Sequence, residues 1–165
     1  MKPVLFAAAC AATAAALAAA AWADSMKDAS FEVTPGQYHW QQNTSVAGIP
    51  ISEDNTECLT EKKASMTLSG LARDLDKSCT VDEVAQTADG YTFKLICTGK
   101  IPGTARAQLV HSDRSMTITA KGNAKVLGIP AGFSVKADAT YVGACTPDQL
   151  AHAAEKEAKE AAKGG

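Results

Sequence analysis

Alternation of apolar and polar residues dominates the second half of the chain. From Ser115 to Val126 the even positions are apolar or small and the odd positions are polar, which predicts a half-buried antiparallel strand. The same period-two pattern runs through residues 133–141 and 91–98, where Ile96 is the exception. Turn residues separate these runs at hairpin spacing. We therefore expect a meander of five strands between residues 79 and 141.

The first half of the chain predicts an earlier strand and an inserted helix. Residues 37–46 read as a strand, and a short strand is expected before Cys58. Thr60 can cap a helix whose apolar residues continue at helical spacing to Leu75. Thr146 and Gln149 form a capping box for a second helix, which starts at Pro147 and continues as a solvated Ala, Glu and Lys sequence.

The large aromatic residues fall on the predicted inner face of the strands, together with many alanines. Large and small side chains mixed on one face favour a strongly curved sheet or a small barrel, although a flat sheet under one helix is an alternative. The predicted class is therefore mainly β, with an antiparallel meander, one inserted helix and a C-terminal helix. The aromatic residues expected to line the interior are Tyr38, Trp40, Tyr91, Phe93, Phe133 and Tyr141.

The N-terminal segment has the features of a secretory leader. Lys2 is followed by an alanine-rich apolar stretch and an Ala21-Trp22-Ala23 cleavage site, so we expect a signal peptide over residues 1–23. Lipidation at Cys10 is disfavoured because the apolar stretch before it is short. We divide the remainder into an N-terminal extension (24–34), a disulfide-stapled β domain (35–146) and a charged C-terminal helix or tail (147–165). The expected location is the periplasm or the exterior, with no membrane span in the mature chain.

Four cysteines follow the leader and predict two disulfides, because exported thiols meet oxidising surroundings. Three pairings of Cys58, Cys79, Cys97 and Cys145 are open. We favour 58–79 and 97–145, since the first pair brackets the inserted helix and the second pair points to the inner face. The zinc alternative lacks a C-x-x-C pair and a histidine cluster, so no metal is expected.

Charge and motifs exclude several classes of function. After loss of Lys2 from the total of 16, 15 basic residues face 18 acidic residues, and no basic stripe suggests nucleic acid. No hydrolase elbow, phosphate-binding loop or histidine-carboxylate metal spacing is present, so we expect neither an enzyme nor a cofactor. His111 beside Asp113 reads as a polar strand end. The acidic residues Glu53, Asp54 and Glu57 read as a solvated turn, not as a calcium loop.

Ile-Pro occurs at three predicted turns, beginning at Ile49, Ile101 and Ile129. In a meander the second and third of these turns emerge at the same end, so Ile101, Pro102, Ile129 and Pro130 are candidate loop contacts. They form either a contact surface or a plug over the core. We expect a non-enzymatic binding module for a small apolar ligand. The alternative is a protein-interaction module, such as a protease inhibitor or envelope-assembly partner.

Several short motifs together are similar to those of a known family. They are Pro35-Gly36-Gln37-Tyr38-His39-Trp40, Cys58-Leu59-Thr60, the single Cys79 and Cys97, and Tyr141-Val142-Gly143-Ala144-Cys145. Over roughly residues 35–147 the chain resembles an exported family of Gram-negative bacteria called domain of unknown function 3617. Tyr38 and His39 replace the tryptophan and glutamate of that family's first motif. The resemblance implies a periplasmic, mainly β domain and supplies no established activity.

Overall fold

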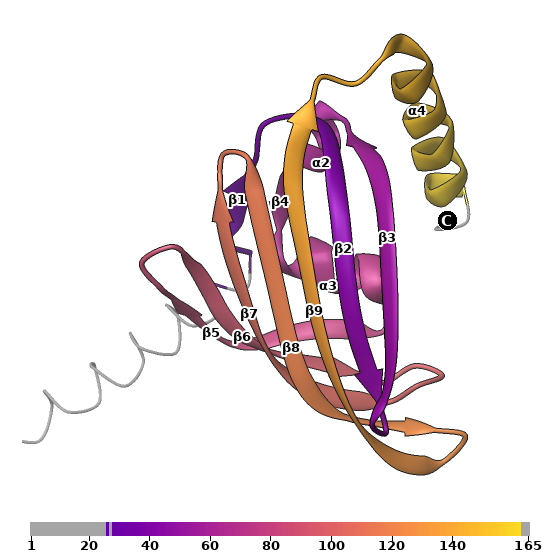
Figure 1. The fold of residues 1–165 in the computed structure, drawn as a ribbon. Helices are drawn as coiled ribbons and strands as arrows, with labels where there is room; N and C mark the ends of the chain where they lie inside the picture. The colour runs from indigo at the N-terminus through magenta and orange to yellow at the C-terminus, as the bar shows by residue number, and fades with distance from the viewer. Residues whose placement is uncertain (1–25, 27, 163–165) are drawn as a thin grey trace, which may run out of the picture.

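The computed structural model describes residue 26 and residues 28–162, so the expected leader lies outside the described residues. Its main sheet has seven strands in the order β3-β2-β9-β8-β7-β6-β5, and all neighbours are antiparallel (Figure 1). The strands are β2 (Gly36–Val46), β3 (Ile49–Leu59), β5 (Cys79–Gln86), β6 (Gly90–Cys97), β7 (Gly103–Ser112), β8 (Ser115–Val126) and β9 (Ile129–Gly143).

The predicted five-strand meander is confirmed as β5 to β9, and the mainly β class is confirmed with it. The sheet is open, with β3 and β5 at its two edges, so the curved sheet is the form observed and the small barrel is not. The short strand expected before Cys58 is an 11-residue strand, β3, which pairs with β2 along its whole length. The two strands are joined by the tight turn at Ala47 and Gly48.

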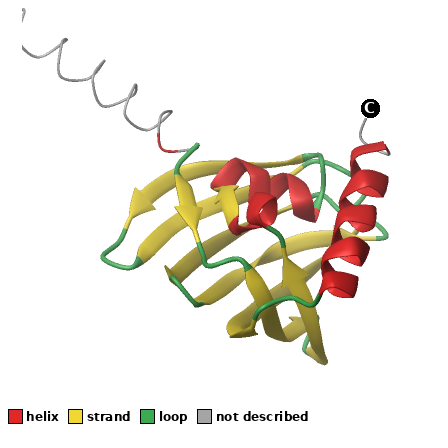
Figure 2. Cartoon of the chain, turned by 90° about the horizontal axis from the view of Figure 1, so that it is seen from above, coloured by secondary structure: helices red, strands yellow, loops and turns green. Residues whose placement is uncertain are grey.

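The chain between β3 and β5 crosses one face of the sheet (Figure 2). It contains α2 (Glu61–Ala64), β4 (Ser65–Thr67) and α3 (Leu68–Leu75), and β4 pairs with β1 (Ser30–Glu32). Thr60 caps α2 as predicted, since its Oγ1 accepts a hydrogen bond from the Lys63 N–H at 3.3 Å. The prediction of one continuous helix is wrong, because pairing with β1 holds three of its residues extended and Thr67 then caps a second helix.

The core lies between this crossing segment and the inner face of the sheet. Leu68 and Ala72 of α3 are buried, as are Tyr38, Leu109 and Met116 of the sheet. Burying a leucine side chain stabilises the fold by roughly 1.5–3 kcal/mol, so α3 contributes strongly to closing this face. Phe31 and Val33, from the segment expected as an N-terminal extension, lie in the same core.

The C-terminal helix α4 (Pro147–Ala162) starts with the predicted capping box. The Thr146 N–H donates to Gln149 Oε1 at 2.8 Å, and the Gln149 N–H donates to Thr146 Oγ1 at 3.3 Å. The helix lies beside the edge strand β3, where Lys156 Nζ is 2.6 Å from Glu57 Oε1. A helix beside an edge strand limits edge-to-edge pairing with other chains.

Two disulfides are present, as expected, but the favoured pairing is wrong. The bonds are Cys58–Cys145 and Cys79–Cys97. Cys79 and Cys97 are direct cross-strand partners in the β5-β6 pair. The crossing segment carries the chain from one edge of the sheet to the other, so it separates Cys58 from Cys79 instead of bringing them together.

Candidate functional site

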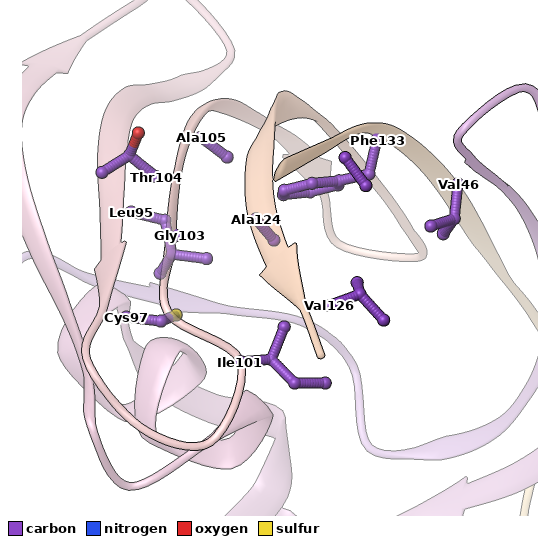
Figure 3. A pocket seen from close by; sticks show the side chains of 11 residues that line it. Val46, Leu95, Cys97, Ile101, Gly103, Thr104, Ala105, Ala124, Val126 and Phe133 are labelled. Atoms are coloured by element: carbon purple, nitrogen blue, oxygen red, sulfur yellow. The ribbon is translucent and has the colours of Figure 1, made fainter. Parts of the chain in front are cut away.

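The inner face of the sheet continues beyond α2 and α3 toward the end where three strand connections emerge (Figure 1). These connections are the β2-β3 turn, the β6-β7 loop and the β8-β9 turn, and we call this part of the molecule the hairpin end. A cavity of about 280 Å³ lies there (Figure 3). Its 11 lining residues are Val46, Leu95, Cys97, Ile101, Gly103, Thr104, Ala105, Ala124, Val126, Ala131 and Phe133.

The register of the sheet explains how these residues meet. Val46 of β2 pairs with Phe133 of β9, which pairs with Gly122 of β8, and Gly122 pairs with Ala105 of β7. Ala105 in turn pairs with Leu95 of β6. Directly paired residues share one face, so this row crosses five strands on the inner face.

Small residues in the middle of this row leave the space, and larger ones form its walls. A Cβ on Gly122 would lie 2.0 Å from the Thr104 carbonyl oxygen, so β8 approaches β7 as closely as only glycine permits. The sequence predicts a bend or bulge at Gly122, and the β7-β8 register passes through it without a shift. Ala105 and Ala124 continue the small surface, while Leu95 and Phe133 face the cavity from either side.

The lining of the cavity is apolar. Among the described lining residues Thr104 has the only hydroxyl group, and none carries a charge. The sulfur of Cys97 is bonded to Cys79, so it is not a free thiol. A lining of this kind favours apolar ligands over water or polar molecules.

The β6-β7 loop closes one side of the cavity. The Lys125 N–H donates to the Pro102 carbonyl oxygen at 2.8 Å and thereby fixes this loop against the end of β8. Lys125 also pairs with Pro130, so the second and third Ile-Pro segments lie on either side of one strand. Ile101 lines the cavity yet remains 59% exposed, and Ile129 is 68% exposed, so neither side chain is a buried plug.

Of the six aromatic residues expected around a ligand, Phe133 lines the cavity and the other five do not. Tyr38 is fully buried, and its ring meets that of Tyr141 edge-to-face at 5.7 Å. The Tyr38 hydroxyl donates to the Thr34 carbonyl oxygen at 2.8 Å, and burial, followed by the effect of Tyr141, raises the Tyr38 pKa above its ordinary value. Tyr38 is therefore part of the core and not of a ligand site.

The other three aromatic residues also serve the packed end of the sheet. Tyr91 stacks on His111 at a ring distance of 6.4 Å, and Phe93 is buried in the core. Trp40 lines a separate hollow of about 160 Å³ between the sheet, α3 and α4. Its Nε1 is buried and has no hydrogen-bond partner among the described residues.

Most of the lining residues were not predicted from sequence, because the expected ligand site consisted of aromatic side chains. The missing residues are Val46, Leu95, Gly103, Thr104, Ala105, Ala124, Val126 and Ala131. The alternation that predicted the strands already placed Ala124 and Val126 on the inner face. What it could not show is where the crossing segment ends, and therefore which part of that face remains uncovered.

The polar groups singled out from sequence lie away from the cavity. Glu53, Asp54 and Glu57 are on strand β3, so the expectation of a turn is wrong there. His39 Nε2 is 2.7 Å from Asp54 Oδ1, and hydrogen bonds from His39 and Gln41 hold the Asp54 pKa below its ordinary value. Within residues 28–162 no group of three or more His, Cys, Asp or Glu is placed to hold a metal ion. The described helices include none with the length and apolar character needed to cross a bilayer.

The comparison with known families agrees with the cysteine and motif spacing. A family model described as "Protein of unknown function (DUF3617)" matches residues 33–145, which include both disulfides and every cavity residue. No curated protein matches the chain, and no solved structure matches it. The site must therefore be interpreted from its own geometry.

Proposed function

This chain belongs to the DUF3617 family of proteins of unknown function, and we propose that it is a non-enzymatic module that binds a small apolar ligand. The observation that carries this proposal is the apolar cavity of about 280 Å³ at the hairpin end. A buried apolar cavity of about 150 Å³ already accepts a molecule the size of benzene. The space here is nearly twice as large and is open on one side, so it holds a ligand with two rings or an alkyl chain and leaves room for a longer ligand to extend outward.

The chemistry of the cavity supports binding without catalysis. General acid-base or nucleophilic catalysis needs a titratable or nucleophilic group within hydrogen-bond reach of the reacting atoms. The described lining residues carry one hydroxyl, on Thr104, and one disulfide sulfur, on Cys97. Thr104 is exposed and alternates along β7 with inward-facing Ala105, so its hydroxyl points to the other face of the sheet. The His39 and Asp54 side chains, on β2 and β3, are both more than one third exposed, and neither contributes to the lining.

The two disulfides support a location outside the cytoplasm. Disulfides form and persist in oxidising compartments and are rare where glutathione and thioredoxin keep thiols reduced. Both described bonds join cysteines of the family-matched region. We place the module in the periplasm or outside the cell, in agreement with the leader expected over residues 1–23.

A titration with the fluorescent apolar probe N-phenyl-1-naphthylamine tests the proposal. The Ala124→Trp variant fills the cavity from β8, and the matched Ala85→Trp variant adds the same side chain at an exposed position of β5. We expect the unaltered protein and Ala85→Trp to bind the probe with equal affinity and Ala124→Trp to lose at least about tenfold, which is about 1.4 kcal/mol. Equal binding by all three proteins would refute the cavity as the binding site.

A protein-contacting role at the same end is the second candidate. The observation in its favour is the exposure of Ile101 and Ile129, both more than half exposed at neighbouring connections. Pull-down with the Ile101→Asp and Ile129→Asp variants tests it. Unchanged recovery of a specific partner by both variants would remove these loops from consideration.

A further inference from the structure

The exposed large apolar side chains of the protein gather at the hairpin end. Among the described residues nine large hydrophobic side chains are exposed, and six of them belong to this end. We call these six the apolar rim: Ile49, Ile51, Ile101, Val126, Leu127 and Ile129. A contiguous apolar surface on a folded protein marks a site of interaction.

Hydrogen bonds join the three connections into one surface. The Ala47 N–H of the β2-β3 turn donates to the Gly132 carbonyl oxygen of β9 at 2.9 Å. The Lys125 N–H of β8 donates to the Pro102 carbonyl oxygen of the β6-β7 loop at 2.8 Å. Because Ile101 and Val126 also line the cavity, the apolar rim is continuous with the cavity wall.

Leu127 stands at the tip of this surface in a strained conformation. It has a φ of 52° and is followed by Gly128 with a φ of 83°, as in the two-residue turns that favour Asn-Gly or Asp-Gly. The left-handed conformation is unfavourable for a bulky residue, and Leu127 is 98% exposed, so packing within the chain does not compensate for it. Burial of Leu127 against a surface outside the chain would offset this backbone cost.

The charges around the apolar rim identify what buries it. Residues 45–51, 98–104 and 122–134 form the hairpin end and contain Lys100 and Lys125 but no Asp or Glu, although acidic residues exceed basic ones in the whole chain. Hydrogen bonds from the hydroxyl and N–H of Ser78, and to a smaller extent the charge of Lys100, hold the pKa of Asp76, after α3, below its ordinary value. Apolar side chains flanked by lysines complement the surface of an anionic bilayer.

We infer that the hairpin end docks on an anionic phospholipid bilayer. Leu127 and Ile129 insert among the acyl chains, while Lys100 and Lys125 lie at the phosphate groups. The contact places the open side of the cavity against the apolar part of the membrane. This inference goes beyond the proposed ligand binding, because the bilayer contact needs no molecule inside the cavity.

Vesicle co-sedimentation tests the inference. The protein and all its variants are expressed in a bacterial host that exports them, and each is purified as the exported product. We expect it to bind vesicles of phosphatidylcholine mixed with phosphatidylglycerol and to bind phosphatidylcholine alone less tightly. Leu127→Asn should lower the affinity for the mixed vesicles by about tenfold or more, because it withdraws a leucine from lipid. Lys100→Gln and Lys125→Gln should each lower it by about fivefold, and only on the anionic vesicles.

Two control variants separate the surface from the fold. Ala47→Asn makes the same turn change at the neighbouring tip, where the φ of Ala47 is 51°, and should bind vesicles as the unaltered protein does. Leu150→Asn removes an exposed leucine from α4 at the far end and should also bind normally. Binding of Leu127→Asn equal to that of Ala47→Asn would overturn the inference, as would failure of the unaltered protein to bind anionic vesicles.

Two further measurements separate this inference from ligand binding and from dimer formation. Ala124→Trp should still sediment with vesicles even when it no longer binds the naphthylamine probe, so the two proposals can fail separately. Light scattering after size-exclusion chromatography should give the mass of a monomer both for the unaltered protein and for Leu127→Asn. A dimer that Leu127→Asn dissociates would overturn the bilayer inference and assign the apolar rim to a second copy of the chain.

Discussion

Cys58, near the end of β3, is bonded to Cys145, which follows β9 and lies 87 residues further along the chain. β2 lies between β3 and β9, and Gln37 near its start pairs with both Cys58 and Gly143. The bond closes a covalent loop that contains five of the seven strands of the main sheet, β5 to β9. Cys79–Cys97, by contrast, joins two adjacent strands with a sequence separation of 18.

The difference in loop length predicts a difference in stability. In the chain-entropy view a disulfide restricts the unfolded chain more when its loop is longer, which gives about 4–5 kcal/mol for Cys58–Cys145 and about 3 kcal/mol for Cys79–Cys97. We expect the Cys58→Ala, Cys145→Ala double variant to unfold at lower urea concentration than the Cys79→Ala, Cys97→Ala double variant. Equal midpoints with equal denaturant dependence would contradict this order.

The strands could be predicted from sequence because their pattern depends on local geometry. Successive side chains of a strand point to opposite faces, so an alternating segment such as 115–126 carries the information for both its conformation and its buried face. The cap at Thr60 and the capping box at Thr146 are local in the same way, and both helix starts are confirmed.

The disulfide pairing and the cavity could not be predicted in this way, because both depend on where distant segments meet. Spacing suggested Cys58 with Cys79, but the chain between them crosses the whole sheet. The aromatic residues predicted a ligand site, but Tyr38 and Phe93 pack in the hydrophobic core under α3. Pairing of β1 with β4 decided where the inserted helix is interrupted, and that contact joins residues 31 and 66.

The buried hydroxyl of Tyr38 yields a second prediction. It donates to the Thr34 carbonyl oxygen at 2.8 Å, so Tyr38→Phe should lower the free energy of unfolding by about 1 kcal/mol. Tyr91→Phe is the matched control, because its hydroxyl makes a longer, exposed contact of 3.4 Å with the Ser30 carbonyl oxygen. A urea titration at neutral pH compares the two, and an equal loss in both variants would contradict the role of the buried bond.

The raised pKa of Tyr38 predicts how that loss depends on pH. Burial holds the proton on the native side chain, so the native Tyr38 pKa lies above the ordinary value of 10.0 that the unfolded chain has. The stabilisation is complete below pH 10 and is lost as the pH rises above it, since only the unfolded state then releases the proton. The stability difference between the unaltered protein and Tyr38→Phe should therefore shrink above pH 10. A stability difference that stays constant above pH 10 would contradict the raised pKa of native Tyr38.

Gly122 predicts a strong effect for a small substitution. An added Cβ would meet the Thr104 carbonyl oxygen at 2.0 Å, which forces β8 away from β7 beside the cavity. We expect Gly122→Ala to lower the free energy of unfolding by about 1–3 kcal/mol. Gly132→Ala is the control, because the nearest atom to its added Cβ, Asn123 Oδ1, lies at 3.7 Å. Thermal unfolding of the two variants measures the difference. An unchanged midpoint for Gly122→Ala would show that β7 and β8 accommodate the added Cβ with no loss of stability.

The turn at Leu127 predicts a variant that is more stable than the natural sequence. Asparagine adopts a left-handed backbone more readily than leucine does, and Asn-Gly is a preferred pair for this two-residue turn. Leu127→Asn should therefore raise the free energy of unfolding by about 1 kcal/mol, and Ala47→Asn should give a similar gain at a φ of 51°. Urea midpoints of the two variants measure these gains. Stabilisation by Leu127→Asn together with weaker vesicle binding would mean that the natural leucine is retained for contact with lipid at the expense of the fold. A loss of stability in Leu127→Asn, with a gain in Ala47→Asn, would instead show that the leucine supports the hairpin itself.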